Sequence, residues 1–288
     1  MNAAYRTALP RSTRFRRVPP SLSFVIPTYN RRALLPAAVD SALTWLDAIG
    51  AGEIVIVDDG STDGTGAMLA ERYAERMAGG QIRFHVRERN GGVAAAKNTG
   101  AGLVKGDWIV FLDSDDEVIP GAVGAVVAAL DGAGDAPVVF FRCVDLESGA
   151  LIGKPLDAPV RLDLDRYARW AWGECLPAMR PAPARQFPFV TDLPGFEGVS
   201  YFRTIPEYGP LLITPIVARR YRTEGDDRVS APGRRLRAMR VRKYVATVLG
   251  EFGGQLSLRV RARLLASYFK ARLEYWVAGG TNLFRAAP

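Results

Sequence analysis

Residues 107–116 read DWIVFLDSDD, an apolar run with a cluster of carboxylates directly behind it. The apolar run predicts a buried strand that ends in a turn. Carboxylates just past a strand end project into the crevice where open α/β sheets bind ligands. Asp113 and Asp115 can share a hard divalent cation, which takes phosphate oxygens as further ligands. The stretch therefore predicts a site for a metal and a diphosphate. The simpler alternative is an acidic turn that caps the helix beginning near Pro120.

The rest of the first 145 residues alternates strand and helix signals. Strands are predicted at residues 22–26, 53–57, 82–86 and 107–112, and helices at residues 32–46, 61–77 and 93–104. Pro27 is expected to end the first strand. Single helices between strands imply right-handed crossovers and a mainly parallel sheet. The predicted fold class is α/β, a Rossmann-like sheet with helices on both faces.

Composition indicates a globular protein of a reducing compartment. The chain has 288 residues, of which 48% are hydrophobic, enough for a sizeable core. Cys143 and Cys175 form neither a disulfide framework nor a metal-binding spacing. No apolar run reaches the length of about 18 residues that a membrane span needs, and no apolar segment of a signal peptide follows the N-terminal arginines. We expect a cytoplasmic protein.

Charge is distributed unevenly along the chain. The net charge is +8, but residues 1–20 carry +5, residues 211–288 carry +11, and the body between them carries −8. An acidic body with basic ends is unlike a nucleic-acid groove, so no nucleic-acid partner is expected. The pattern favours a catalytic body whose positive patch meets an anionic lipid or acceptor, at the inner face of the membrane.

Four motifs follow the predicted strands and helices of the first half. PTYN stands at residues 27–30, DDGS at 58–61, NGG at 90–92 with AKN at 96–98, and DSDD at 113–116. Neither G-x-x-x-x-G-K-[ST] nor a G-x-G-x-x-G after the first strand is present, so the usual phosphate loops are absent. In order and spacing, the four motifs resemble the family 2 glycosyltransferases, which have the GT-A fold. The resemblance covers roughly residues 20–145.

The resemblance implies transfer of a sugar from a nucleotide-sugar to an acceptor with inversion, assisted by Mg²⁺ or Mn²⁺. For the metal, it implies Asp115 as the direct ligand and Asp113 as a ligand of ribose or metal, while Asp116 is expected to cap the next helix. Lys97 stands where the family often has Arg. A lysine still supplies a positive charge for the nucleotide or phosphate, but it lacks the guanidinium that can form two parallel hydrogen bonds. The residues that it assigns to the nucleotide-sugar are Pro27, Tyr29, Asn30, Asp58 or Asp59, Asn90, Lys97, Asp113 and Ser114.

The transfer also needs a general base for the acceptor hydroxyl. The family usually supplies it from a Glu-Asp pair at the start of a helix. The corresponding segment of this chain is PGFEGVSYFR at residues 194–203, where Gly198 replaces the expected Asp. Glu197 is the leading candidate for the base and Asp192 the second. The alternative for Glu197 is an acid that stabilises a helix N-terminus.

The second half of the chain is less regular. Residues 151–195 are rich in Pro, Arg and aromatics, which predicts little contribution to the core and a variable acceptor face. We expect a basic, disordered arm over residues 1–20, a GT-A catalytic domain over 21–232 and a basic helical extension over 233–288. Within the catalytic domain, residues 21–145 form the nucleotide-sugar half and 146–232 the acceptor half.

A helix with interleaved cations is predicted over residues 256–277. It either packs on the body with a solvated basic face or lies on a membrane that holds a lipid-linked acceptor, with Tyr275 and Trp276 at the headgroups.

The sequence thus predicts a glycosyltransferase that moves a sugar, expected from a UDP-sugar, to a glycan or glycoconjugate in surface polysaccharide or glycolipid biosynthesis. A sugar-nucleotidyltransferase is an alternative, but it should carry a Gly-rich basic loop where PTYN stands. Gly198 motivates a second alternative, a nucleotide-sugar-binding protein with lost or weak transfer.

Overall fold

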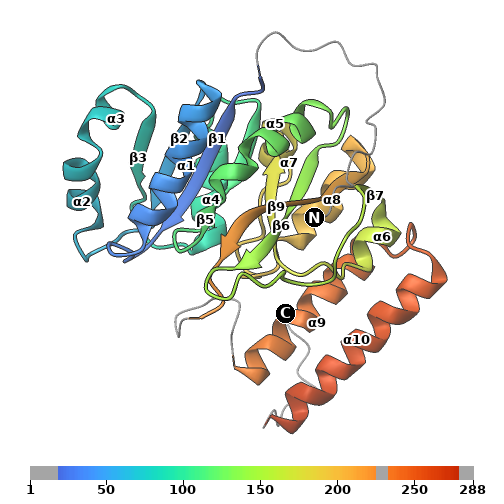
Figure 1. The fold of residues 1–288 in the computed structure, drawn as a ribbon. Coiled ribbons are helices and arrows are strands. Elements are labelled where there is room, and N and C mark those ends of the chain that lie inside the picture. The colour runs from blue at the N-terminus through green and yellow to red at the C-terminus, as the bar shows by residue number, and fades with distance from the viewer. Residues whose placement is uncertain (1–18, 225–232, 279–288) are drawn as a thin grey trace.

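The computed structural model describes residues 19–224 and 233–278. In this part of the chain a nine-stranded sheet has helices on both faces (Figure 1). Its strand order is β3-β2-β1-β4-β8-β6-β9-β5, and β7 pairs with β9 outside this path. The α/β class and the predicted parallel arrangement of the first four strands are confirmed.

The first half supplies the parallel part of the sheet. Its strands are β1 Leu22–Thr28, β2 Gly52–Asp58, β3 Ile82–Val86 and β4 Trp108–Phe111, and its helices are α1 Leu35–Ile49, α2 Thr65–Arg72, α3 Ala74–Ala78 and α4 Val93–Leu103. The expectation that Pro27 ends the first strand is wrong. Pro27 lies beyond Val25, the last residue of β1 that pairs with β4, so its missing N–H interrupts no ladder there.

The helix predicted over residues 61–77 is two helices. The break falls at Tyr73, whose φ of −118° leaves the helical range. The Tyr73 ring is buried, and its hydroxyl donates to Asp40 on α1 at 2.8 Å. The hydrogen bond from Tyr73 to α1 therefore lies at the turn where the chain changes direction before β3.

The second half completes the sheet. Its strands are β5 Glu117–Val118, β6 Val138–Asp145, β7 Val160–Leu162, β8 Cys175–Met179 and β9 Leu211–Tyr221. Its helical elements are η1 Pro120–Ala122, α5 Val123–Asp131, α6 Leu164–Ala168, α7 Pro181–Gln186 and α8 Gly198–Tyr208. β6 and β9 run in the direction of the first four strands, so the sheet is mainly parallel.

The expectation that residues 151–195 contribute little to the core is wrong. β8 lies between β4 and β6 and is antiparallel to both. Leu176, Ala178 and Met179 are buried on it, although Pro177 stands in its middle. The strand has only five residues, and its one proline interrupts the apolar signal that would have identified it.

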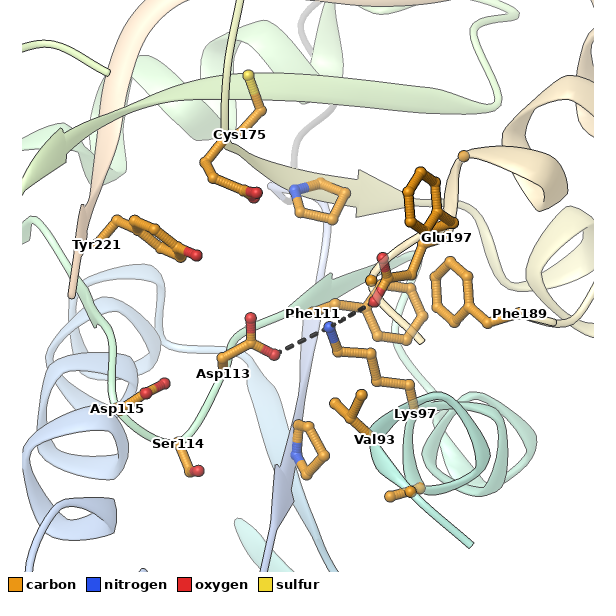
Figure 2. Close-up of a pocket in the computed structure, with 18 of the residues that line it drawn as sticks. Val93, Lys97, Phe111, Asp113, Ser114, Asp115, Cys175, Phe189, Glu197 and Tyr221 are labelled. Atoms are coloured by element: carbon orange, nitrogen blue, oxygen red, sulfur yellow. Dashed lines mark ion pairs between the residues drawn. The ribbon is translucent and has the colours of Figure 1, made fainter. Parts of the chain in front are cut away.

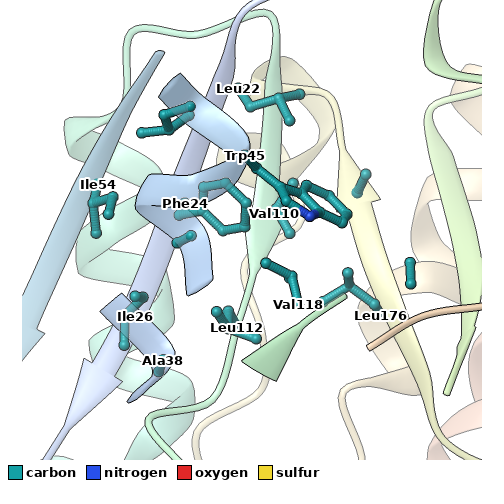
Figure 3. Close-up of a cluster of buried hydrophobic side chains, with 14 of the residues drawn as sticks. Leu22, Phe24, Ile26, Ala38, Trp45, Ile54, Val110, Leu112, Val118 and Leu176 are labelled. Carbon is teal, nitrogen blue, oxygen red and sulfur yellow. The ribbon is translucent and has the colours of Figure 1, made fainter. Parts of the chain in front are cut away.

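Two hydrophobic cores cover the two faces of the sheet. Alternate residues of β1 divide between them: Phe24 and Ile26 pack under α1, whereas Val25 faces α4. Figure 3 shows the first core, where Phe24 meets Trp45 of α1 edge to face at 5.9 Å between ring centroids. The Trp45 indole N–H donates to the Ile119 carbonyl at 2.9 Å, which satisfies the one polar group of this buried ring.

A helical hairpin, α9 Arg234–Phe252 and α10 Leu258–Val277, follows the sheet (Figure 1). The helix predicted over residues 256–277 is confirmed; it begins after Ser257, whose hydroxyl caps the Val260 N–H. Val248 and Phe252 of α9 join the second core. The domain boundary at residue 232 stays a prediction. Among the described helices, none is both long and apolar enough to cross a membrane.

Close packing of α4 on β1 gives a stability prediction. A Cβ at Gly100 would stand 2.4 Å from a Val25 methyl, whereas one at Gly102 meets nothing within 4 Å. We expect Gly100→Ala to lower the free energy of unfolding by about 1–3 kcal/mol through overpacking. Gly102→Ala, in the same helix, should raise it by about 0.5–1 kcal/mol. Urea unfolding measures both, and equal effects would contradict the packing argument.

Candidate functional site

A cavity of about 670 Å³ opens where the carboxyl ends of β1, β2 and β4 meet. Side chains from both halves of the chain line it (Figure 2). The sequence-predicted residues that line it are Pro27, Tyr29, Asp59, Asn90, Lys97, Asp113, Ser114, Asp115 and Glu197.

Lys97 connects two carboxylates across the cavity. Its Nζ lies 2.9 Å from Asp113 Oδ1 and 3.8 Å from Glu197 Oε1, as the dashed lines in Figure 2 show. The lysine comes from α4, Asp113 from the end of β4, and Glu197 from the start of α8. Burial disfavours the ammonium, but the two carboxylates outweigh it and hold the pKa of Lys97 above its usual value.

Arg219 on β9 is a second buried cation beside Asp113. Its guanidinium lies 3.2 Å from Asp116 and 3.9 Å from Asp113, and its Nε donates to Cys143 Sγ at 3.1 Å. Burial raises the pKa of Asp113, but Lys97 and Arg219 outweigh it and keep the pKa below its usual value. Arg219 could not be predicted from the sequence, because no local motif surrounds it and the β6–β9 pairing brings it here.

Asp116 does not cap the next helix, contrary to the expectation. Its carboxylate accepts from the Arg222 N–H at 2.9 Å, and so fixes the end of β9. Neither η1 nor α5 has a side-chain cap. Burial raises the pKa of Asp116 to about 7, against the attraction of Arg219, and Asp113 adds to the rise.

Asp115 is the carboxylate of the motif that remains available. It lines the cavity and forms no ion pair with any residue that the structure describes. Burial and the neighbouring charge of Asp113 raise its pKa. A cation at this position would relieve that repulsion.

The two aspartates of the DDGS motif have different surroundings. Asp59 lines the cavity; its carboxylate pairs with Arg87 and accepts from the Gly91 and Gly92 N–H groups. Asp58 instead accepts from the Ser61 N–H and hydroxyl, away from the cavity lining. Of the two alternatives that the sequence left open, geometry favours Asp59.

Two other predicted residues also lie outside the cavity lining. Asn30 has a φ of 52°, and its side-chain oxygen accepts from the Thr62 N–H at 2.8 Å, so it holds the turn behind the site. Asp192 forms an ion pair with Lys243 on α9 and is largely exposed. The second candidate for the base therefore points to the hairpin rather than to Asp113.

Glu197 stands at the N-cap of α8 without making a capping hydrogen bond. Its side chain turns into the cavity toward Lys97 (Figure 2). At the next position, a Cβ on Gly198 would lie 3.3 Å from the hydroxyls of both Tyr167 and Tyr244. The rings occupy the space that an aspartate would need. Tyr244 belongs to α9, so the hairpin contributes to the cavity wall.

Aromatic rings form the wall near Glu197. Phe140 meets Trp170 and Tyr201 edge to face, at 5.0 and 5.1 Å between centroids. Glu174 also lines the cavity, and burial raises its pKa. Trp170 and Glu174 belong to the Pro-rich segment, whereas Phe140 lies on β6 and Tyr201 on α8. None of them belongs to a recognisable sequence motif, so the sequence did not predict them as site residues.

Comparison with known proteins places the chain in a family. The model of glycosyl transferase family 2 matches residues 23–173. The chain therefore belongs to glycosyl transferase family 2, as the motifs indicated.

Characterised relatives resemble only part of the chain. It is 36% identical over 115 residues to the succinoglycan biosynthesis protein ExoO of Rhizobium meliloti, covering 40% of this chain and 31% of that protein. It is 38% identical over 125 residues to validoxylamine A glucosyltransferase of Streptomyces hygroscopicus, covering 43% and 29%. The chain thus matches about a third of the length of these relatives.

Solved structures confirm the GT-A fold. Staphylococcus aureus TarS 1–349 in complex with UDP-GlcNAc matches with a TM-score of 0.66 at 17% identity, covering 92% of this chain and 76% of that one. The mannosyltransferase PcManGT of Pyrobaculum calidifontis, in complex with GDP-Man and Mn²⁺, matches with a TM-score of 0.62 at 19% identity, covering 92% and 77%.

The buried arginine gives a second stability prediction. Arg219→Met leaves Asp116 buried without its ion partner, so the free energy of unfolding should fall by about 3–5 kcal/mol. The adjacent Arg220 pairs with Glu117 at 3.8 Å near the surface, so Arg220→Met should cost at most about 1 kcal/mol. Chemical denaturation of the two variants compares them directly, and a larger loss in Arg220→Met would refute the assignment.

Proposed function

We propose that this protein is an inverting glycosyltransferase that moves a sugar from a nucleotide-sugar to a hydroxyl of a glycan or lipid-linked acceptor. The observation that carries this proposal is the Lys97 bridge, which brings the carboxylate pair at the end of β4 beside Glu197 in one cavity. The names of the relatives, among them proteins of succinoglycan and chondroitin synthesis, support a role in surface polysaccharide or glycolipid biosynthesis.

The donor would occupy the end of the cavity formed by the first half of the chain. Tyr29 is 47% exposed there, so its ring is open for stacking on a base. Asn90 and the backbone around Gly92 line the same end. We propose a UDP-sugar; the UDP-GlcNAc complex of the structurally similar TarS supports this choice.

The residues present fit a Mg²⁺ or Mn²⁺ ion that retains water and phosphate ligands. In the described part of the chain no three potential ligands cluster as a closed site. Asp115 forms no ion pair with the residues that the structure describes and is destabilised by Asp113, so it would hold the metal, with Asp113 nearby for the ribose or the metal. When bound, such an ion neutralises the charge of the departing diphosphate.

Glu197 would act as the general base. The acceptor oxygen forms a bond to the anomeric carbon as the bond from that carbon to the diphosphate oxygen breaks, and the hydroxyl proton passes to Glu197. Attack from the face opposite the leaving group inverts the anomeric centre. Lys97 contacts Asp113 and Glu197 together, and so fixes the base relative to the donor end.

A panel of nucleotide-sugars, with and without Mn²⁺, tests the proposal. We expect one donor to release its nucleoside diphosphate in a metal-dependent way, because transferases leak sugar to water. Gly198, with two tyrosines in place of a second acid, favours an alternative: a protein that binds the donor without transferring sugar. Donor binding by calorimetry without any turnover would establish that alternative.

Asp115→Asn tests the metal ligand. The change removes a charge at nearly constant shape and leaves no partner unpaired among the described residues. Donor turnover should fall by about 10²-fold or more, while the melting temperature stays at or above that of the wild type. Full activity in this variant, or in the wild type after exhaustive chelation, would exclude a metal at Asp115.

Glu197→Gln tests the base. Turnover should fall by about 10²-fold or more while nucleotide affinity stays near the wild-type value. Asp192→Asn is the matched control, because Asp192 pairs with Lys243 outside the cavity, and it should retain activity within about threefold. If Asp192→Asn abolishes turnover and Glu197→Gln does not, the roles must be exchanged.

A further inference from the structure

Helix α10 is the last described helix of the chain (Figure 1). A row of apolar side chains lies exposed along it. Their spacing of seven, four, four and three residues keeps them on one face of the helix. Between 45% and 75% of each side chain is exposed to solvent. The residues of this apolar stripe are Leu258, Leu265, Phe269, Leu273 and Trp276.

The stripe is distinct from the face that attaches α10 to the protein. Val260, Leu264 and Ala271 are buried on the opposite side of the helix. Tyr275, expected at the headgroups, instead packs toward α9: its hydroxyl accepts from Arg235 at 3.0 Å, and that guanidinium lies over its ring. The apolar pattern of the sequence therefore divides into two faces, and in the described part of the chain one of them is buried and the other exposed.

Cations border the stripe. Arg259, Arg263 and Lys270 are exposed along one side, and Arg261 and Arg272 lie on the other, half-buried. The hairpin as a whole, residues 233–277, contains eleven basic and two acidic residues. A single exposed apolar residue needs no explanation, but a continuous stripe bordered by cations does.

We infer that the apolar stripe is a docking surface for an anionic phospholipid bilayer. Apolar side chains enter the boundary between headgroups and acyl chains, while the bordering cations meet lipid phosphates. Trp276 suits that interface because its ring is amphipathic. A second copy of the chain is disfavoured as the occupant, since pairing two such faces would bring like charges together.

Docking also relates to the proposed acceptor. The hairpin that carries the stripe contributes Tyr244 to the cavity wall near Glu197. A docked hairpin would therefore bring that wall to the surface that holds a lipid-linked acceptor. This consequence rests on the proposed function, whereas docking itself does not.

Vesicle flotation of the full chain tests the inference. We compare phosphatidylcholine vesicles with an equal mixture of phosphatidylcholine and phosphatidylglycerol. Binding to the mixture should exceed binding to phosphatidylcholine by about tenfold or more and weaken as salt is raised. The double variant Phe269→Ser/Leu273→Ser should lose at least about tenfold in binding. Val86→Ser, which changes an exposed apolar residue on β3, is the control and should bind like the wild type.

The outcomes separate docking from folding and catalysis. Both altered stripe residues are exposed, so circular dichroism and donor turnover without vesicles should match the wild type. A stripe variant that still floats, or a wild-type chain that ignores anionic vesicles, would overturn the inference. Sedimentation of the wild type as a dimer that the stripe variant dissociates would identify a second copy as the occupant instead. Absence of donor turnover in the wild type, with its binding to anionic vesicles intact, would count against the proposed function alone.

Discussion

Asp113 lies between two buried cations, and the architecture of the site depends on this arrangement. Lys97 approaches it from α4 and Arg219 from β9, so one carboxylate is compensated from both halves of the chain. A buried charge without a partner costs several kcal/mol, and roughly 3–5 kcal/mol is lost when one member of such a pair is removed. The need to pair these groups therefore helps to hold the two halves of the sheet in register around the cavity.

The three neighbouring aspartates, Asp113, Asp115 and Asp116, differ in their ion partners. Asp113 and Asp116 are committed to cations, and Asp116 also fixes the start of the segment after β9 through the Arg222 N–H. Asp115 is left facing the cavity with its negative charge opposed by burial and by Asp113. Three carboxylates within four residues thus have different surroundings, and Asp115 is the one that forms no ion pair with the described residues.

The cavity wall near Glu197 depends on parts of the chain far apart in sequence. Gly198 leaves room for the hydroxyls of Tyr167 and Tyr244, which come from α6 and α9. The hairpin is therefore part of the cavity wall as well as the carrier of the apolar stripe. The glycine that replaces the expected acid and the basic C-terminal hairpin are therefore in contact, because Tyr244 of α9 lies against Gly198.

The sequence by itself determined the α/β class, the order of the first four strands and the motifs at their ends. These signals are local: an apolar run followed by polar residues is visible in any window of about ten residues. Motif position also identified many of the residues of the first half that line the cavity. Only the tertiary structure decided that Asp59 rather than Asp58 faces the cavity, that Arg219 completes the site, and that β8 enters the sheet through a Pro-rich segment. Those outcomes depend on pairings between residues about 30 to 110 positions apart. A local pattern in the sequence does not specify which distant residue will pair with a strand or a buried charge.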